Sequence, residues 1–250
     1  MPLIANDIQM ARTSIIILGI ILVTAFMAVM VILVSFVTAG GDTAHKVGRI
    51  WAKCILALSN IRVTVKGLSN LKPGRSYIYM ANHMSNFDIP VLQAFLPVQF
   101  RWLAKAELYK IPVFGYAMKR AGYISIDRSD RKSAIESLNK AVKIIRDGIS
   151  VVIFPEGTRS RNHNIQPFKK GGFFLAVDSG VPIIPIIIHG TERIMPKKQM
   201  LIKPGNVTLE IAKPINSSDY TRKTKNDLMD KIRDIFLKSF EKNKKNGSLC

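Results

Sequence analysis

Cysteine and histidine are scarce in this chain of 250 residues, which holds two cysteines and four histidines. Two cysteines, Cys54 and Cys250, are too few for a disulfide framework, which agrees with a reducing cytoplasm. No histidine and cysteine cluster occurs at metal-ligand spacing, so the sequence predicts no metal site. Phosphate-binding loops of the GxGxxG or Walker type are missing as well, and we expect no bound cofactor.

Acidic residues are also few. The chain has 17 aspartates and glutamates against 37 lysines and arginines, a formal net charge of +20. Such basicity suits nucleic acid, an anionic bilayer or an acidic protein. Aromatic residues do not alternate with the basic ones and no common nucleic-acid-binding motif is present, which excludes nucleic acid as the preferred partner. Anionic headgroups attract each nearby basic side chain by ~1 kcal/mol, so we expect an anionic membrane as partner.

Charge is absent from residues 13–39, a run of 27 apolar or uncharged residues. This length exceeds the ~20 residues with which a helix crosses the hydrocarbon core. It also exceeds the apolar part of a secretory signal. We therefore expect residues 1–41 to be kept as an N-terminal membrane anchor.

The basic residues that flank this segment predict its orientation. Arg12 precedes it, while Lys46, Arg49 and Lys53 follow it closely. The positive-inside tendency then places the rest of the chain in the cytoplasm, at the inner membrane. The sequence also allows a helical hairpin that enters and leaves one leaflet, with a bend at residues 40–41 or near Thr24.

The remaining chain alternates short apolar runs with amphipathic stretches. This alternation predicts an α/β fold with a mixed, mostly buried sheet flanked by helices. We expect one domain over residues 42–242 and a flexible tail over 243–250. The last helix shows a continuous apolar face, which either covers the sheet, the preferred interpretation, or lies on the membrane. The predicted strands are 61–65, 76–80, 101–104, 123–126, 150–154, 183–188 and 207–211, and the predicted helices are 42–58, 89–95, 105–108, 113–121, 131–146, 172–179 and 220–242.

A histidine and an aspartate, His83 and Asp88, stand five residues apart directly after the predicted strand 76–80. On one continuous helix they would point about 140° apart. The pair can meet if His83 lies on a loop and Asp88 in the first turn of the next helix, with Pro90 just inside it. The carboxylate would then hold one ring nitrogen and leave the other free to accept a proton. We assign no such role to His45, His163 or His189.

A second polar segment, Pro155-Glu156-Gly157-Thr158-Arg159-Ser160, follows the predicted strand 150–154. It combines a carboxylate, hydroxyl groups, a glycine and a guanidinium. Ligands of open α/β sheets bind at such strand ends, which makes this segment the second part of a predicted site.

The two segments NHMSNFD and FPEGTRS resemble the signature blocks of the glycerolipid acyltransferase family, which includes the 1-acyl-sn-glycerol-3-phosphate acyltransferases. Weaker similarities follow the family's order, at residues 114–128 between the signatures and at residues 181–191 after them. The resemblance spans about residues 46–215. It implies an enzyme that acylates lysophosphatidic acid to phosphatidic acid, with acyl-carrier protein or coenzyme A as the thiol carrier. The positive charge would also attract an acidic carrier protein.

This resemblance gives the polar residues expected roles. His83 would act as general base and Asp88 would orient it. The family implies that Glu156 and Gly157 help to bind the glycerol phosphate; pairing of Glu156 with Arg159 is the structural alternative. We also expect the Gly157 N–H to stabilise the oxyanion.

An anionic acceptor needs cations. Arg159, whose planar fork suits a phosphate, is the first candidate. Lys105, Arg120 and Arg128 are further candidates, and Thr158 completes the predicted substrate-binding set. Ser85 and Asn86 are expected to cap the following helix.

Three other functions stay open at this point. The same chemistry could serve another lysolipid or an amino-acid lipid. Water could replace the acceptor, which would make the protein a thioesterase. The chain could also be a non-enzymatic basic membrane adaptor.

Overall fold

The computed structural model describes residues 2–160, 164–197 and 199–245, so that His163 and Cys250 lie outside the described residues. Within these ranges, seven strands form one sheet in the order β1-β7-β6-β2-β5-β3-β4. All neighbouring strands are parallel except β6 and β7, which are antiparallel. The predicted mixed α/β sheet is therefore confirmed. The strands are β1 (Ile61–Lys66), β2 (Ile78–Ala81), β3 (Arg101–Lys105), β4 (Ile124–Ile126), β5 (Val151–Ile153), β6 (Ile183–His189) and β7 (Gly205–Ile211).

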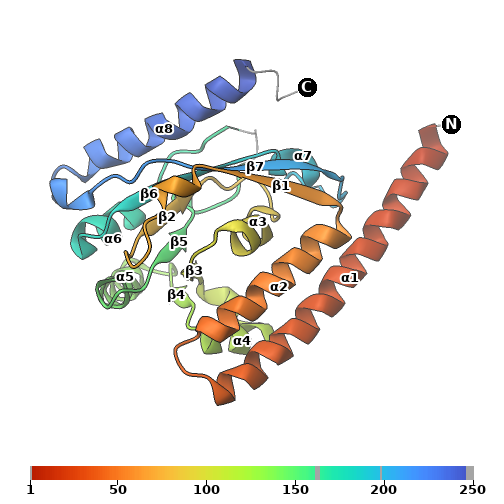
Figure 1. Cartoon of the computed structure of the whole chain (residues 1–250), viewed down its shortest axis with the longest axis horizontal. Helices are drawn as coiled ribbons and strands as arrows, with labels where there is room; N and C mark the ends of the chain where they lie inside the picture. Colours follow the sequence, from red (N-terminus) through yellow and green to blue (C-terminus); the bar gives the residue numbers. More distant parts are fainter. Residues whose placement is uncertain (1, 161–163, 198, 246–250) are drawn as a thin grey trace.

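Helices cover both faces of this sheet (Figure 1). Tyr77 and Tyr79 pack in one buried cluster with α2 and α3, and Ile78 and Met80 pack in another with α5, α6 and α8. This division follows from the strand, whose successive side chains point to opposite faces. The helices are α1 (Pro2–Val37), α2 (Asp42–Leu58), α3 (Asp88–Phe95), α4 (Phe114–Arg120), α5 (Arg131–Arg146), α6 (Gly171–Ser179), α7 (Thr191–Ile194) and α8 (Lys225–Lys245), with 3₁₀ turns η1 (Leu68–Asn70), η2 (Ala106–Lys110) and η3 (Ser217–Asp219).

The last helix covers the sheet with its apolar face, as preferred from its sequence. Leu228, Ile232 and Phe236 of α8 are fully buried in the sheet's second cluster. The helix begins at Lys225, five residues later than predicted, and it continues to Lys245. The first three residues of the predicted tail are thus helical, and residues 246–250 lie outside the described part. The predicted helix 105–108 is instead the 3₁₀ turn η2.

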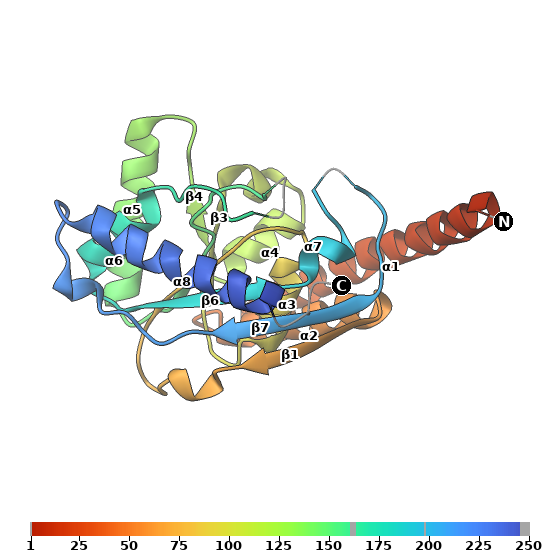
Figure 2. The same ribbon diagram turned by 90° about the horizontal axis from the view of Figure 1, so that it is seen from above.

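The N-terminal helix α1 is one uninterrupted helix of 36 residues, with no bend near Thr24. Gly40 and Gly41, both at positive φ, then reverse the chain into α2, which packs antiparallel to α1 (Figures 1 and 2). The Trp51 indole N–H donates to the Thr24 hydroxyl across the two helices at 2.9 Å. Within the described residues, α1 is the helix long and apolar enough to cross a bilayer.

Strand order decides where the polar loops meet. Strand β2 lies between β5 and β6 and is parallel to both. The carboxyl ends of three adjacent parallel strands share one edge of the sheet. The segments that follow them, which begin at Asn82, Phe154 and Gly190, therefore converge. The Asn82 side chain fastens two of these ends, since it donates to the Ile188 carbonyl at 3.0 Å and accepts the Ile188 N–H at 2.7 Å.

Candidate active site

The predicted contact between His83 and Asp88 is present. His83 lies on the loop after β2, Asp88 is the first residue of α3, and Pro90 lies two residues further into that helix. The His83 Nδ1 atom is 2.8 Å from the Asp88 Oδ2 atom. The imidazole is 14% exposed and the carboxylate is fully buried. Because Nδ1 is engaged by Asp88, Nε2 is the ring nitrogen left for a substrate.

The Asp88 carboxylate accepts further hydrogen bonds from three groups. The backbone N–H groups of Met84 and Ser85 donate to Oδ2 at 2.7 and 2.8 Å. The Thr191 hydroxyl donates to Oδ1 at 2.5 Å. Hydrogen bonds to an ionised carboxylate favour the ionised form. These donors fix the carboxylate, and through it the plane of the His83 ring.

An aromatic side chain from the neighbouring strand supports the His83 ring on its face. Phe154, directly after β5, stacks on the imidazole with ring centroids 3.9 Å apart and an angle of 12° between the planes. Trp102 of β3 stacks behind Phe154 at 5.8 Å. The ring of His83 is thus held by Asp88 at its edge and by Phe154 on its face.

Glu156 lies behind the cavity wall. Its side chain is buried, and its oxygens accept the N–H groups of His83 at 2.7 Å and Gln166 at 2.9 Å. These N–H groups take the place of the Arg159 partner considered from the sequence. Burial raises the pKa of the Glu156 carboxyl from 4.5 to about 7. The side chain therefore supports the backbone of His83 and does not face a ligand.

Gly157 differs from its expected role. Its N–H donates to the Phe154 carbonyl at 3.0 Å, so this group is not free to bind an oxyanion. The residue has φ +71, and a Cβ atom there would lie 2.9 Å from the Lys169 Cδ atom. The turn therefore requires glycine for both its conformation and its space.

Ser85 was expected to cap α3. Its hydroxyl accepts the Phe87 N–H at 3.2 Å, but Phe87, the N-cap residue of α3, makes no side-chain capping hydrogen bond.

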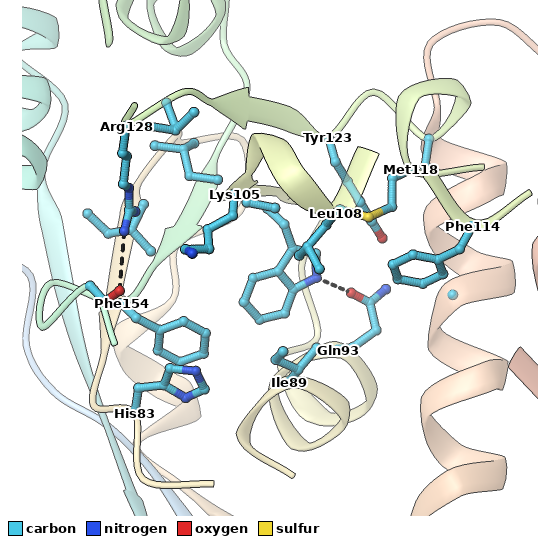
Figure 3. A pocket seen from close by; sticks show the side chains of 18 of the residues that line it. His83, Ile89, Gln93, Lys105, Leu108, Phe114, Met118, Tyr123, Arg128 and Phe154 are labelled. Atoms are coloured by element: carbon cyan, nitrogen blue, oxygen red, sulfur yellow. Dashed lines mark hydrogen bonds between the residues drawn. The ribbon is translucent and has the colours of Figure 1, made fainter. Parts of the chain in front are cut away.

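His83 faces a cavity of about 610 Å³ (Figure 3). The polar end is lined by His83, Thr158 and four cationic side chains, and no carboxylate lines the cavity among the described residues. The four cations are Lys105, Arg128, Arg159 and Lys169. The polar end is therefore suited to an anionic group.

The cationic side chains reach the cavity from separate segments. Arg128 donates to the Gly157 carbonyl at 3.2 Å. Lys197 donates to the Thr158 hydroxyl at 3.2 Å and to the Arg159 carbonyl at 2.6 Å, and thereby holds the loop that carries Arg159. Lys169 and Lys197 were not expected from the sequence, because no motif distinguishes them from the other basic residues.

Arg120 lies elsewhere, which corrects its predicted place in the site. Its guanidinium donates to the Ser35 hydroxyl at 2.7 Å and to the Ser35 carbonyl at 2.6 Å. It also lies 5.1 Å from the ring centroid of Phe36. Arg120 therefore fastens α4 to the end of α1.

The far end of the cavity is apolar and lies between α1, α2 and α4. Its lining includes Met27, Ala28, Leu108, Phe114 and Met118. Figure 3 shows Phe114 and Met118 on the side of the cavity away from His83. One cavity thus joins a cationic end beside His83 to an apolar end beside α1.

The buried side chain of Gln93 links three segments behind the apolar wall of the cavity. The Trp102 indole N–H donates to the Gln93 carbonyl oxygen at 2.8 Å, and the Gln93 amide donates to the His45 carbonyl at 3.2 Å. Burial lowers the pKa of the His45 imidazole to about 3, with Arg49 and Arg101 adding to the effect. His45 is thus a neutral packing residue. His189 contacts the Ser239 hydroxyl at 3.1 Å, away from the cavity lining.

Comparisons with known proteins agree with this arrangement. The family model described as Acyltransferase matches residues 62–189. A chloroplastic 1-acyl-sn-glycerol-3-phosphate acyltransferase of Brassica napus is 35% identical over 70% of this chain. The chain spans about half the length of that relative, 51%. The human 1-acyl-sn-glycerol-3-phosphate acyltransferase alpha is 32% identical over 86% of this chain and 76% of its own length.

A solved structure extends the similarity to the whole chain. The crystal structure of the 1-acyl-sn-glycerophosphate acyltransferase PlsC from Thermotoga maritima superposes with a TM-score of 0.78 at 26% identity. The match covers 97% of this chain and 98% of that one. The resemblance inferred from the two signature segments is confirmed, and the chain belongs to the acyltransferase family.

Proposed function

We propose that this protein transfers an acyl group from a thioester to the free sn-2 hydroxyl of 1-acyl-glycerol-3-phosphate, which gives phosphatidic acid. One observation carries the proposal: the His83–Asp88 pair faces a single cavity that is cationic at one end and apolar at the other. Such a cavity matches substrates that combine a phosphate with acyl chains. The names of the relatives support the same acceptor.

In the proposed reaction, Nε2 of His83 removes the proton of the acceptor hydroxyl as its oxygen attacks the thioester carbonyl carbon. A tetrahedral oxyanion forms. Its collapse breaks the carbon–sulfur bond, and the imidazolium gives the proton to the departing thiolate, which leaves as the thiol. Asp88 holds the ring through Nδ1 and stabilises the imidazolium while it exists.

The acceptor phosphate is proposed to bind at the cationic end. Arg159 offers a planar pair of N–H donors that fits a phosphate, and the ammonium groups of Lys105 and Lys169 add point charges. Arg128 adds charge while it supports Gly157. Thr158 lines the same cavity, and its hydroxyl accepts a hydrogen bond from Lys197. The acyl chain then occupies the apolar end of the cavity.

The donor is proposed to be acyl-carrier protein or acyl-coenzyme A, whose thioester supplies the acyl group without a bound cofactor. The anchor over residues 1–41 and the basic surface would hold the enzyme on an anionic membrane. The flanking charges favour the cytoplasmic face for its catalytic domain.

The test is turnover by purified protein in detergent, with labelled acyl thioesters and a panel of lysolipids, analysed by product mass. Lysophosphatidic acid should give phosphatidic acid, and His83→Ala should lower turnover by about 10²–10⁴-fold, the usual contribution of a general base. Circular dichroism should show an unchanged fold.

Other outcomes identify the alternative functions. Faster acylation of another lysolipid or of an amino-acid lipid would identify that lipid as the acceptor. Thiol release that is equally fast without any lysolipid would indicate a thioesterase. If no panel member is acylated and His83→Ala leaves binding to anionic membranes intact, the protein is an adaptor and the proposal is wrong.

A further inference from the structure

A short segment outside the N-terminal helices groups several exposed large apolar side chains. Residues 106–116 comprise η2, Pro112 and the start of α4, and we call them the apolar rim. Within eleven residues, Leu108 is 36% exposed, Ile111 46%, Val113 47% and Tyr116 46%. Adjacent exposed apolar residues of this size are uncommon on a soluble surface and mark contact sites.

The backbone of the rim gives a second reason to expect a partner. Val113 has φ 62, a conformation that β-branched residues rarely adopt. Strained residues of this kind persist where function requires the geometry. Here the strained residue also exposes its apolar side chain, so neither burial within the chain nor relaxed geometry explains it.

The rim lies beside α1 and shares the cavity with it. Ala117 and Ala121 of α4 pack in one buried cluster with Ala28 and Val31 of α1. Leu108 of the rim and Met27 of α1 line the same apolar end of the cavity. Figure 3 shows Leu108 between His83 on one side and Phe114 and Met118 on the other. The rim and α1 therefore both line the apolar end of the cavity.

The outer face of α1 and the basic residues in and around the rim both suit a lipid surface. The outer face of α1 is itself apolar and exposed, with Leu22, Phe26 and Val29 among its exposed residues. The segment 105–120 carries four basic residues and one acidic residue, Glu107. This combination of apolar side chains with flanking positive charge favours anionic lipid over a second copy of this basic chain.

We propose that the apolar rim is a second bilayer contact, separate from α1, and that it presses the apolar end of the cavity against the lipid. An acyl chain then enters sideways from the bilayer between the rim and α1. The contact with lipid does not depend on the proposed function, whereas the route of the acyl chain rests on it.

The contact can be measured without activity. Single cysteines replace Ile111 or Ile135 in a background with Cys54→Ser and Cys250→Ser, and each carries a nitrobenzoxadiazole probe. Ile135, on α5, is a matched control because it is 47% exposed. In vesicles of phosphatidylcholine and phosphatidylglycerol, the probe at position 111 should shift its emission to the blue and be quenched by lipids with doxyl-labelled acyl chains.

The probe at position 135 should show neither effect. Equal quenching at the two positions, or none at either, contradicts the proposal. A blue shift at position 111 that depends on protein concentration and not on lipid would identify a second copy of the chain as the occupant, and would also overturn it.

A kinetic arm tests the acyl route. Ile111→Glu should raise the KM for a long-chain lysophosphatidic acid in vesicles by about tenfold, since a charge at a lipid contact opposes binding. It should leave turnover of a short-chain acceptor in solution unchanged, and Ile135→Glu should change neither. Absence of turnover in every variant would count against the proposed function. The fluorescence result would still decide whether the rim contacts lipid. An equal KM in the two glutamate variants would contradict the route.

Discussion

Four hydrogen-bond donors converge on the carboxylate of Asp88, and one of them comes from far along the chain. The His83 ring and two loop N–H groups share Oδ2, while the Thr191 hydroxyl binds Oδ1. Thr191 follows β6, is fully buried and does not itself line the cavity. It acts on the reaction only through Asp88 and is therefore a positioning residue.

Thr191→Val keeps the shape of the side chain and removes its hydroxyl. A donor to a charged group contributes about 1.5–3 kcal/mol, so we expect kcat to fall at least about tenfold while KM for both substrates stays near its original value. Thr191→Ser should restore most of the rate. Thr64→Val, at an exposed position on β1, is the control. A rise in KM with unchanged kcat would show that Thr191 does not position the dyad.

Glu156 predicts a pH dependence of stability. Burial raises its pKa from 4.5 to about 7, so the folded chain keeps a proton that the unfolded chain releases. Its contribution to stability is present below pH 4.5 and is lost as the pH rises to about 7. This contribution to the free energy of unfolding is at most about 3 kcal/mol.

Urea unfolding of the wild type and of Glu156→Gln in detergent, between pH 4.5 and 8, measures this contribution. The free energy of unfolding of the wild type should fall with rising pH relative to that of the variant. Glu136→Gln, on the exposed face of α5, should follow the wild type. Parallel curves for wild type and Glu156→Gln would contradict the raised pKa.

Local spacing was enough to predict the pairing of His83 with Asp88, because a loop followed by a helix start brings residues five apart together. It could not predict Thr191, Phe154 or Lys197, which reach the site only because β5 and β6 flank β2. The error over Arg120 has a similar cause. On a chain with 37 basic residues, the sequence does not show which one faces the cavity.

At the scale of elements, apolar alternation predicted every strand but not the order of the strands. The edge strand β1 pairs with β7, about 140 residues later, through a register of Ile61 with Gly205. Such pairing depends on the packing of the intervening helices and leaves no local pattern. The sequence allowed a bend near Thr24 or at residues 40–41, and the chain turns at Gly40 and Gly41. Whether the segment spans the bilayer or dips into one leaflet stays a prediction.

The junction of α1, α2 and α4 predicts how acyl chain length is selected. Small residues, Ala28, Ala44, Ala117 and Ala121, pack there and line the apolar end of the cavity. Ala28→Leu adds three carbon atoms to this end and should shift the preferred donor to shorter acyl chains. Product masses from a mixture of donors of different chain length measure the shift. Ile135→Leu is the control, and an unchanged product profile would show that the acyl chain ends elsewhere.

At the scale of the whole molecule, the packing of α1 limits how the protein meets a bilayer. The Thr13 hydroxyl accepts the Ile202 N–H at 3.2 Å, the Thr24 hydroxyl binds Trp51, and Ala28 packs on α4. These contacts hold α1 against the domain from residue 13 to residue 28, over about 22 Å of the helix. The hydrocarbon core is ~30 Å thick. If α1 crossed it, the attached domain would have to enter the lipid.

We therefore expect α1 to lie in one leaflet, with both of its ends and the domain on the cytoplasmic side. Single cysteines at Asp7, before the first of these contacts, and at Lys140, on the exposed face of α5, can be treated with a membrane-impermeant maleimide. In intact cells both should be protected, and in inside-out membrane vesicles both should react to the same extent. Reaction of the two positions from opposite sides would show that the helix crosses the bilayer, because only a spanning α1 separates its first turns from the domain.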